Sequence, residues 1–233
     1  MPVDFATALQ RISILALPAI FAITFHEAAH GFVAYRLGDD TAMRMGRVTF
    51  NPLRHIDPIG TILIPLVLFF TTGFLFGYAK PVPVNFGRLR HPRIDMVWVA
   101  LAGPATNIVL AIVSALLAYV LPFVPAVGYA WAAGNLVTSM QFNVLLAVFN
   151  MIPLPPLDGG RVAVGLLPDV LAFPLARLER YGLLIIVALL FVLPSLGQHM
   201  HLNLDVLAYV IGYPAEYVLR GIAWLTGVNG GFI

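Results

Sequence analysis

The sequence predicts an all-α polytopic membrane protein with four to six transmembrane or re-entrant helices and a small β element at the membrane surface. Hydrophobic residues make up 60% of the chain and charged residues only 10%, whereas a soluble domain carries about 25% charged residues. The mean hydropathy is +0.91. Several windows of about 20 residues, the length that spans a bilayer core, lack Lys, Arg, Asp and Glu. We expect residues 1–233 to form one domain, with a core at about 9–162 and C-terminal helices at about 181–226.

The hydrophobic segments can be placed in order along the chain. Crossings are expected at residues 9–36, 95–121, 131–153 and 181–198. A stretch with two prolines and a glycine at 122–128 predicts a short turn between the second and third crossings. Segments 59–78 and 204–226 are also apolar, and each is open to two interpretations. The first interpretation is a full crossing of the membrane. The second is a segment that stays on one side, either in the interface or as a re-entrant element.

The β element is expected from two short segments outside the crossings. Arg47–Phe50 contains β-branched and aromatic residues that favour a strand. Lys80–Asn85 contains two prolines, each of which drives the residue before it toward extended backbone. We expect these two pieces to form a short sheet at the membrane surface.

The basic residues predict the orientation in the membrane. Eleven of the 13 Lys and Arg residues lie in three segments: Arg36, Arg44, Arg47 and Arg54; Lys80, Arg88, Arg90 and Arg93; Arg161, Arg177 and Arg180. By the positive-inside rule, all three segments face the cytosol and the N-terminus lies outside. Segment 59–78 must then return to the side it left; the competing interpretation is a full crossing with one basic loop outside. We expect a multi-pass protein of the cell membrane.

His26, Glu27 and His30 form an HExxH motif inside the first crossing. On a helix, the two imidazoles lie at i and i+4 on one face, where both can bind one Zn²⁺, and the Glu is placed to deprotonate a water activated by the metal. Ionisable residues within a membrane are costly and usually functional. The alternative is that these are polar groups satisfied by hydrogen bonds within a helix bundle.

Asp158 is the best candidate for a third ligand. It follows the third crossing at its cytosolic end, so it lies at a depth similar to that of the histidines. The prolines before it stop the helix, and Gly159 and Gly160 free the backbone beside it. The alternative for an Asp before two glycines is a simple turn residue. With the HExxH motif present, the ligand interpretation is favoured.

These motifs resemble those of the site-2 protease family of intramembrane zinc metalloproteases. The resemblance rests on His26–His30, on Gly103-Pro104-Ala105-Thr106-Asn107 and on the run Asn150–Arg161, in that order. Residues 51–60 and 79–85 also look like bacterial and archaeal members. The family's PDZ insertion has no counterpart, so no sensing role known for members with that insertion is expected here.

The resemblance implies an activity and a role for each motif residue. It implies one Zn²⁺ per chain, bound by His26, His30 and Asp158, with Glu27 as the general base. The implied activity is regulated intramembrane proteolysis: a zinc endopeptidase that hydrolyses peptide bonds in or near transmembrane helices of membrane proteins. Under the predicted orientation, the active site lies toward the cytosolic side.

Asn107 and Asn150 are candidates to stabilise the oxyanion, because each is an amide at the boundary of an apolar segment. The alternative for Asn107 is a hydrogen bond between helices. A transmembrane substrate must unwind near the zinc, and an exposed strand edge would then bind it by β-augmentation. We expect that edge at 44–50 and 80–86, with 59–78 beside it as a lid or support.

The main alternative function is a metal-binding membrane transporter or channel that uses the same His/His/Asp cluster. No inverted repeat is visible, and binding alone does not require the Glu between the histidines. An inactive scaffold that grips membrane helices is also conceivable, although ligands and base are intact. The absence of cysteine excludes disulfides and thiolate chemistry, and the basic residues belong to loops, so no nucleic-acid partner is expected. The partners expected are the lipid bilayer and a transmembrane-helix protein substrate, with the oligomeric state left open.

Overall fold

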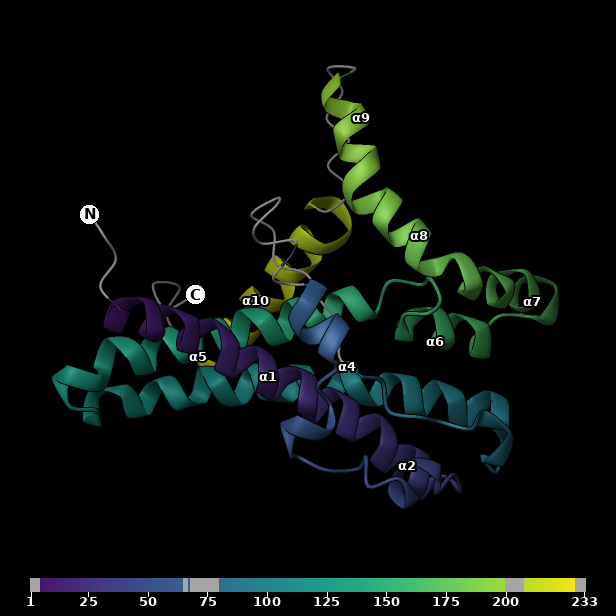
Figure 1. Cartoon of the computed structure of the whole chain (residues 1–233), viewed down its shortest axis with the longest axis horizontal. Coiled ribbons are helices and arrows are strands. Elements are labelled where there is room, and N and C mark those ends of the chain that lie inside the picture. Colours follow the sequence, from purple (N-terminus) through teal and green to yellow (C-terminus); the bar gives the residue numbers. More distant parts are fainter. Residues whose placement is uncertain (1–4, 65–66, 68–79, 200–207, 229–233) are drawn as a thin grey trace.

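The three longest helices form a bundle. A computed structural model describes residues 5–64, 67, 80–199 and 208–228. Helices α1 (Phe5–Arg36), α4 (Pro92–Leu117) and α5 (Ala126–Asn150) lie side by side along the long axis of the molecule (Figure 1). Helix α4 continues into a 3₁₀ turn, η4 (Ala118–Phe123). Among the described residues, three helices are long and apolar enough to cross a membrane: Leu9–Arg36, Pro92–Phe123 and Ala126–Asn150. The first three expected crossings are therefore confirmed as apolar helices of spanning length.

Small and polar residues on one face of α4 bring the bundle together. Val99, Gly103, Asn107 and Ala111 recur every four residues and are all buried. That spacing places them on one side of the helix, which packs on α1 and α5. Small residues on this face allow the helix backbones to approach closely, as is typical of packing within membranes.

The C-terminal helix α10 (Tyr213–Thr226) packs against the same bundle. Its residues Ala215 and Ile222 join a buried cluster with Ala111 of α4 and with Met140 and Val144 of α5. A short π-helical turn, η7 (Ala208–Gly212), leads into it. The expected segment 204–226 is thus helical from 208 onward, is docked on α4 and α5, and is not among the spans of sufficient length.

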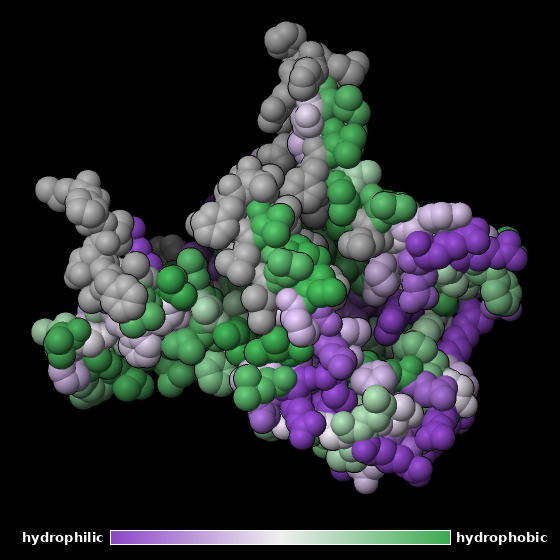
Figure 2. Space-filling view, in the orientation of Figure 1, coloured by the Kyte–Doolittle hydropathy of each residue, from purple (hydrophilic) through white to green (hydrophobic). Residues whose placement is uncertain are grey.

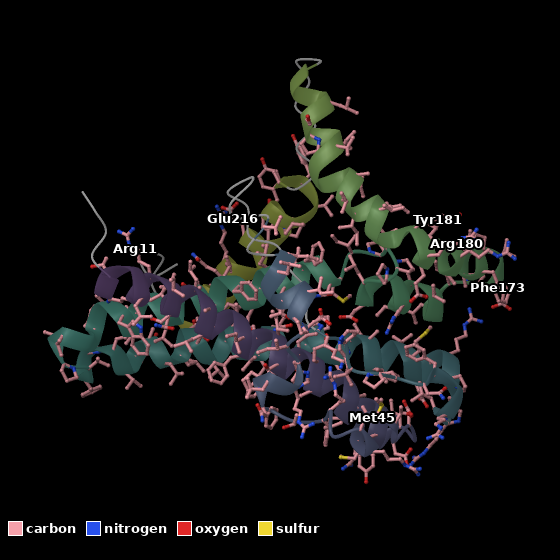
Figure 3. The ribbon with its side chains drawn as sticks, viewed as in Figure 1. Arg11, Met45, Phe173, Arg180, Tyr181 and Glu216 are labelled. Atoms are coloured by element: carbon pink, nitrogen blue, oxygen red, sulfur yellow. The ribbon has the colours of Figure 1, made fainter. Side chains whose placement is uncertain are left out.

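One end of the bundle carries most of the polar elements. They are α2 (Thr41–Arg44), η1 (Pro52–Arg54), η2 (Pro58–Leu63), η3 (Phe86–Arg88), α6 (Asp158–Leu166), α7 (Asp169–Arg177) and η5 (Leu178–Tyr181). Figure 2 shows hydrophilic residues gathered at this end and hydrophobic residues over the rest of the bundle. Arg11 lies near the start of α1, whereas Arg180 lies far from it at the corner before α8 (Gly182–Val187) (Figure 3). There its guanidinium stacks 4.7 Å from the centre of the Tyr181 ring.

The fourth expected crossing, 181–198, forms a helical arm. It consists of α8, a π-helical stretch η6 (Ala188–Val192) and α9 (Leu193–His199), which leave the bundle together (Figure 1). It is not one of the three described helices that meet the length and hydropathy of a span. Most of segment 59–78 lies outside the described residues, so the choice between re-entrant and crossing interpretations is unchanged.

The expected β element is not confirmed, because no strand is formed within the described part of the chain. Segments 47–50 and 80–85 do come together, but a buried side chain joins them instead of a backbone ladder. The Arg47 guanidinium donates to the carbonyl of Arg54, to that of Lys80 at 2.7 Å and to that of Pro81 at 3.3 Å. Prolines at 81 and 83 lack the N–H groups that a regular ladder needs.

Candidate metal centre

His26 and His30 project from α1 toward α4, and their i, i+4 spacing places both on the same face of α1. Both imidazoles are buried, and each has its Nδ1 held by a hydrogen bond. The Nδ1–H of His26 donates to Oδ1 of Asn107 at 2.5 Å, and that of His30 donates to the backbone carbonyl of Val99 at 2.7 Å. Each Nε2 is thereby left with its lone pair, and the two Nε2 atoms lie 3.0 Å apart. A second hydrogen-bond partner on the far nitrogen is the usual way that a histidine is oriented toward a metal.

Asp158 is brought to the histidines by a tight turn after α5. It is the first residue of α6 and is buried, and its Oδ2 lies 3.2 Å from Nε2 of His26 and 3.4 Å from that of His30. A Cβ on Gly159 would lie 2.2 Å from the carbonyl oxygen of Met151, and one on Gly160 would lie 2.1 Å from the nitrogen of Pro155. Only glycine fits these two positions, and this close turn places the carboxylate.

The donor set fits a zinc ion. His26, His30 and Asp158 form the described group of ligand atoms that could hold a metal. Bonds of about 2.0–2.1 Å in a tetrahedral site set donor atoms about 3.3 Å apart, which matches the three separations above. Oδ2 of Asp158 is buried and makes no hydrogen bond of acceptable geometry, so it lacks the partner that a buried carboxylate oxygen requires. These observations support a cation at this point.

The backbone of Gly103 forms the wall of this site on α4. A Cβ there would lie 2.5 Å from Nε2 of His30 and 2.6 Å from Nε2 of His26. Glycine is needed here for close approach, since any side chain would push into the imidazoles. The motif around 103–107 therefore serves the site as well as the packing of the helices.

Glu27 is half-buried next to His26, and the extended segment 80–85 passes over it. Its Oε2 accepts a hydrogen bond of 2.7 Å from the backbone N–H of Val82. Segments 47–50 and 80–85 both pack on α1 here, because a Cβ on Gly31 would lie 2.9 Å from Val48 and 3.0 Å from Val82. The carboxylate is thus held beside the two histidines by the segment that the sequence suggested for substrate binding.

Asp39 anchors the other end of that segment. Its Oδ2 accepts from the backbone N–H of Asn85 at 2.6 Å, and its Oδ1 accepts from the N–H of Thr41 at 3.0 Å and from its hydroxyl at 2.5 Å. Burial by itself would raise the pKa of Asp39. The hydrogen bonds from Thr41 and Asn85, with the charge of Arg88, outweigh it and lower the pKa below the ordinary value.

The two asparagines suggested for the oxyanion differ in their surroundings. Both Nδ2 hydrogens of Asn107 are used: one donates to the carbonyl of Ala22 at 3.2 Å and the other to Oδ1 of Asn143 at 2.7 Å. Asn150 donates one Nδ2 hydrogen to the carbonyl of Leu146 at 2.9 Å. Asn107 therefore has no N–H left for a substrate, whereas Asn150 has one that no described residue accepts.

Asn143 is a polar residue of the site region that sequence reasoning missed. It is almost fully buried at the centre of the bundle and contacts Asn107 directly. The available signal was an amide inside the apolar stretch 131–153, which in a membrane helix indicates a polar contact between helices.

A separate apolar groove of about 850 Å³ lies against α4. Its lining includes Trp98, Ala105, Val148 and Met151 and contains no ionisable side chain. This groove therefore offers no side chain for acid–base or metal chemistry.

Comparisons with known proteins place this chain in a family. The family model described as peptidase family M50 matches residues 130–193. A relative from Bacillus subtilis, "Putative zinc metalloprotease YwhC", is 39% identical over 82% of this chain and 85% of its own length. Two relatives with the same description are Rip2 of Mycolicibacterium smegmatis, 32% identical over 77% of this chain and 66% of its own, and MJ0611 of Methanocaldococcus jannaschii, 42% identical over 68% and 72%. No solved structure matches the chain. With this similarity, the chain belongs to peptidase family M50, the site-2 protease family, and is a zinc metalloendopeptidase.

Proposed function

We propose that the protein is an intramembrane endopeptidase that cleaves membrane proteins in or near their transmembrane helices. One observation carries the proposal: the helix that bears the HExxH motif is itself one of the three apolar helices of spanning length. Its two histidines meet Asp158, which begins α6 after the turn that follows α5, another of these helices. The family supports a peptidase, so the transporter alternative is not favoured.

His26, His30 and Asp158 are the proposed zinc ligands, and Glu27 is the proposed general base. Zinc bound there supplies Lewis acidity to a water molecule and to the scissile carbonyl. Glu27 takes a proton from that water on its carboxylate and delivers it to the leaving amine. The N–H of Val82 holds one carboxylate oxygen, which leaves the other for the proton.

The extended segment 80–85 is the proposed edge for an unwound substrate. In extended backbone, the N–H and C=O of alternate residues point to the same side. The backbone groups of Pro81 and Pro83, which have no N–H, therefore point to one side of the segment. Those of Val82 and Val84 point to the other side. The Val82 N–H reaches Glu27. The Val84 N–H makes no hydrogen bond to another described residue, so it can pair with a substrate strand beside the catalytic base.

Asn150 is the amide that we propose for the oxyanion. It ends α5, just before the turn that leads to Asp158. Within the described part of the chain, its Nδ2 donates only to the carbonyl of Leu146, which leaves one hydrogen for a substrate. A donor positioned at the developing charge typically contributes about 10²–10³-fold in rate. We propose that Asn107 instead orients His26, since both N–H groups of Asn107 already donate hydrogen bonds within the protein.

The proposed location is the cell membrane, with the active site toward the cytosol. Helices α1 and α5 run in one direction and α4 in the other, because the end of α1, the start of α4 and the end of α5 meet at the metal centre. The polar elements of that end contain the three basic segments, which favours its placement on the cytosolic side.

The test is cleavage of a single-span model substrate in liposomes by zinc-loaded protein. The Glu27→Gln variant should retain zinc but lose at least 10²-fold in cleavage rate. Glu216→Gln, which changes an exposed carboxylate of α10 paired with Arg220, is the matched control and should cleave normally. Mass spectrometry of the products locates the cut. Normal cleavage by Glu27→Gln, or cuts confined to soluble loops far from the span, would refute the proposal.

A further inference from the structure

A chain of buried amides runs from His26 into the centre of the bundle. His26 Nδ1–H donates to Oδ1 of Asn107, whose Nδ2 donates to Oδ1 of Asn143 at 2.7 Å. Nδ2 of Asn143 then donates to the backbone carbonyl of Ser139 at 2.8 Å. Both asparagine side chains are shielded from solvent, with Asn107 0% and Asn143 1% exposed. The first hydrogen bond joins α1 to α4, the second joins α4 to α5, and the third lies within α5. The chain of hydrogen bonds is therefore continuous from α5 through α4 to α1.

The far end of this chain decides the direction of every hydrogen bond in it. An amide can face either way, and its orientation follows from the partners it finds. The Ser139 carbonyl can only accept, so Nδ2 of Asn143 faces it and Oδ1 of Asn143 faces Asn107. Nδ2 of Asn107 must then face Asn143, and Oδ1 of Asn107 must face His26. His26 is therefore protonated on Nδ1, with the lone pair on Nε2.

His30 provides an internal contrast. Its Nδ1–H donates to the backbone carbonyl of Val99, which cannot reverse, so its tautomer does not depend on any side-chain orientation. The tautomer of His26 depends on an amide that could turn. The Ala22 carbonyl, 3.2 Å from Nδ2 of Asn107, favours the same orientation but through a longer contact. Asn143 is thus the stronger of two restraints on Asn107.

We propose that Asn143 is a positioning residue for the metal centre: it orients Asn107, which sets the tautomer of His26 and presents Nε2 to zinc. This inference rests on the proposed role of His26 as a ligand. Partners beyond the ligands typically change metal affinity by about 10–100-fold. Because Ala22 keeps part of the restraint, we expect a loss of about 10-fold on removal of Asn143.

Three variants test the proposal in purified, detergent-solubilised protein. Asn143→Leu has a similar size but no acceptor for Asn107. Asn143→Asp keeps both functions, because a carboxyl group buried among apolar helices carries its proton; its carbonyl can then accept from Asn107 and its hydroxyl can donate to Ser139. Asn135→Leu is the matched control, since Asn135 also lies in α5 and donates to the carbonyl four residues earlier, that of Trp131 at 2.9 Å.

Zinc affinity by chelator competition should fall about 10-fold for Asn143→Leu, stay near wild type for Asn143→Asp and be unchanged for Asn135→Leu. Nitrogen-15 NMR of the histidines in metal-free protein gives a second, activity-independent signal. His26 should be an Nδ1–H tautomer in the wild type and a mixture in Asn143→Leu, while His30 is unaffected. This signal still distinguishes the outcomes if Asn143→Leu does not fold, because an Nε2–H tautomer of His26 in wild-type protein would by itself overturn the proposal.

Failure of this inference is distinguishable from failure of the proposed function. Zinc binding in the wild type that is equally tight in Asn143→Leu would refute the positioning role and leave the ligand set intact. Zinc binding that survives His26→Ala would refute the ligand set itself.

Discussion

Replacing Gly103 with alanine is the sharpest test of the metal centre, because it adds one methyl group at its wall. The new Cβ would lie 2.5 Å from Nε2 of His30 and 2.6 Å from Nε2 of His26, whereas ordinary contact begins at 3.4 Å. The shortfall is about 0.9 Å. The atoms in the way are Nε2 of both imidazoles and Cε1 of His26, so relief requires the imidazoles to turn away or α4 to move outward.

The expected cost falls on metal binding more than on folding. Overpacking a well-packed interior costs about 1–3 kcal/mol, and alanine regains about 1 kcal/mol over glycine within a helix. The net loss of stability is then about 0–2 kcal/mol, which a folded protein tolerates. A displacement near 1 Å at a reacting centre costs about 10²-fold in rate, and zinc affinity should fall by at least 10-fold.

The assay measures zinc content after dialysis against a weak chelator, together with cleavage of the model substrate and the thermal unfolding midpoint. Gly221→Ala is the matched control, since a Cβ on Gly221 of helix α10 meets nothing within 4 Å and should stabilise the protein slightly. If Gly103→Ala retains zinc and cleaves at the wild-type rate, the geometry described for this centre is wrong.

Three further outcomes are expected. Asp158→Asn should reduce zinc content well below one ion per chain, and undiminished zinc by elemental analysis would remove Asp158 from the ligand set. In intact cells, Arg44→Cys and Arg90→Cys should react only with a membrane-permeant maleimide. Val127→Cys, at a position that is 96% exposed, should also react with an impermeant maleimide. Labelling of Arg44→Cys and Arg90→Cys from opposite sides would make the segment between them a full crossing. Because the pKa of Asp39 is lowered in the folded protein, its contribution to stability is complete above the ordinary Asp pKa and is lost as the pH falls through the folded pKa. Asp39→Asn should therefore lower the free energy of unfolding near neutral pH by about 2 kcal/mol and flatten its decline in acid; an unchanged acid profile would contradict this.

Several features of the site could be predicted from local sequence rules. The i, i+4 spacing of His26 and His30 places both imidazoles on one helix face wherever the helix lies. Asp158 could be assigned because helix lengths set its depth, and the structure does bring its carboxylate to the two histidines. The two glycines after it could be recognised as a tight turn, and the turn is indeed too close for any side chain.

Other features depend on contacts that leave no local pattern. The β element was expected from extended backbone at 47–50 and 80–85. In the structure, the carbonyls of Lys80 and Pro81 instead accept hydrogen bonds from the Arg47 guanidinium. A side chain that binds three carbonyls has no periodic signature. Asn143 looked like one polar residue in an apolar helix, and only its contact with Asn107 connects it to the metal centre.

The sequence alone determined the class of protein and the residue types of the candidate zinc site. These follow from hydrophobic length and from the spacing of a motif within one helix. Only the tertiary structure decided what orients those residues: Asn107 on His26, Val82 on Glu27 and Gly103 against both imidazoles. The physical reason is that orientation depends on hydrogen bonds and close contacts between helices, and such contacts join residues whose separation in the chain carries no rule.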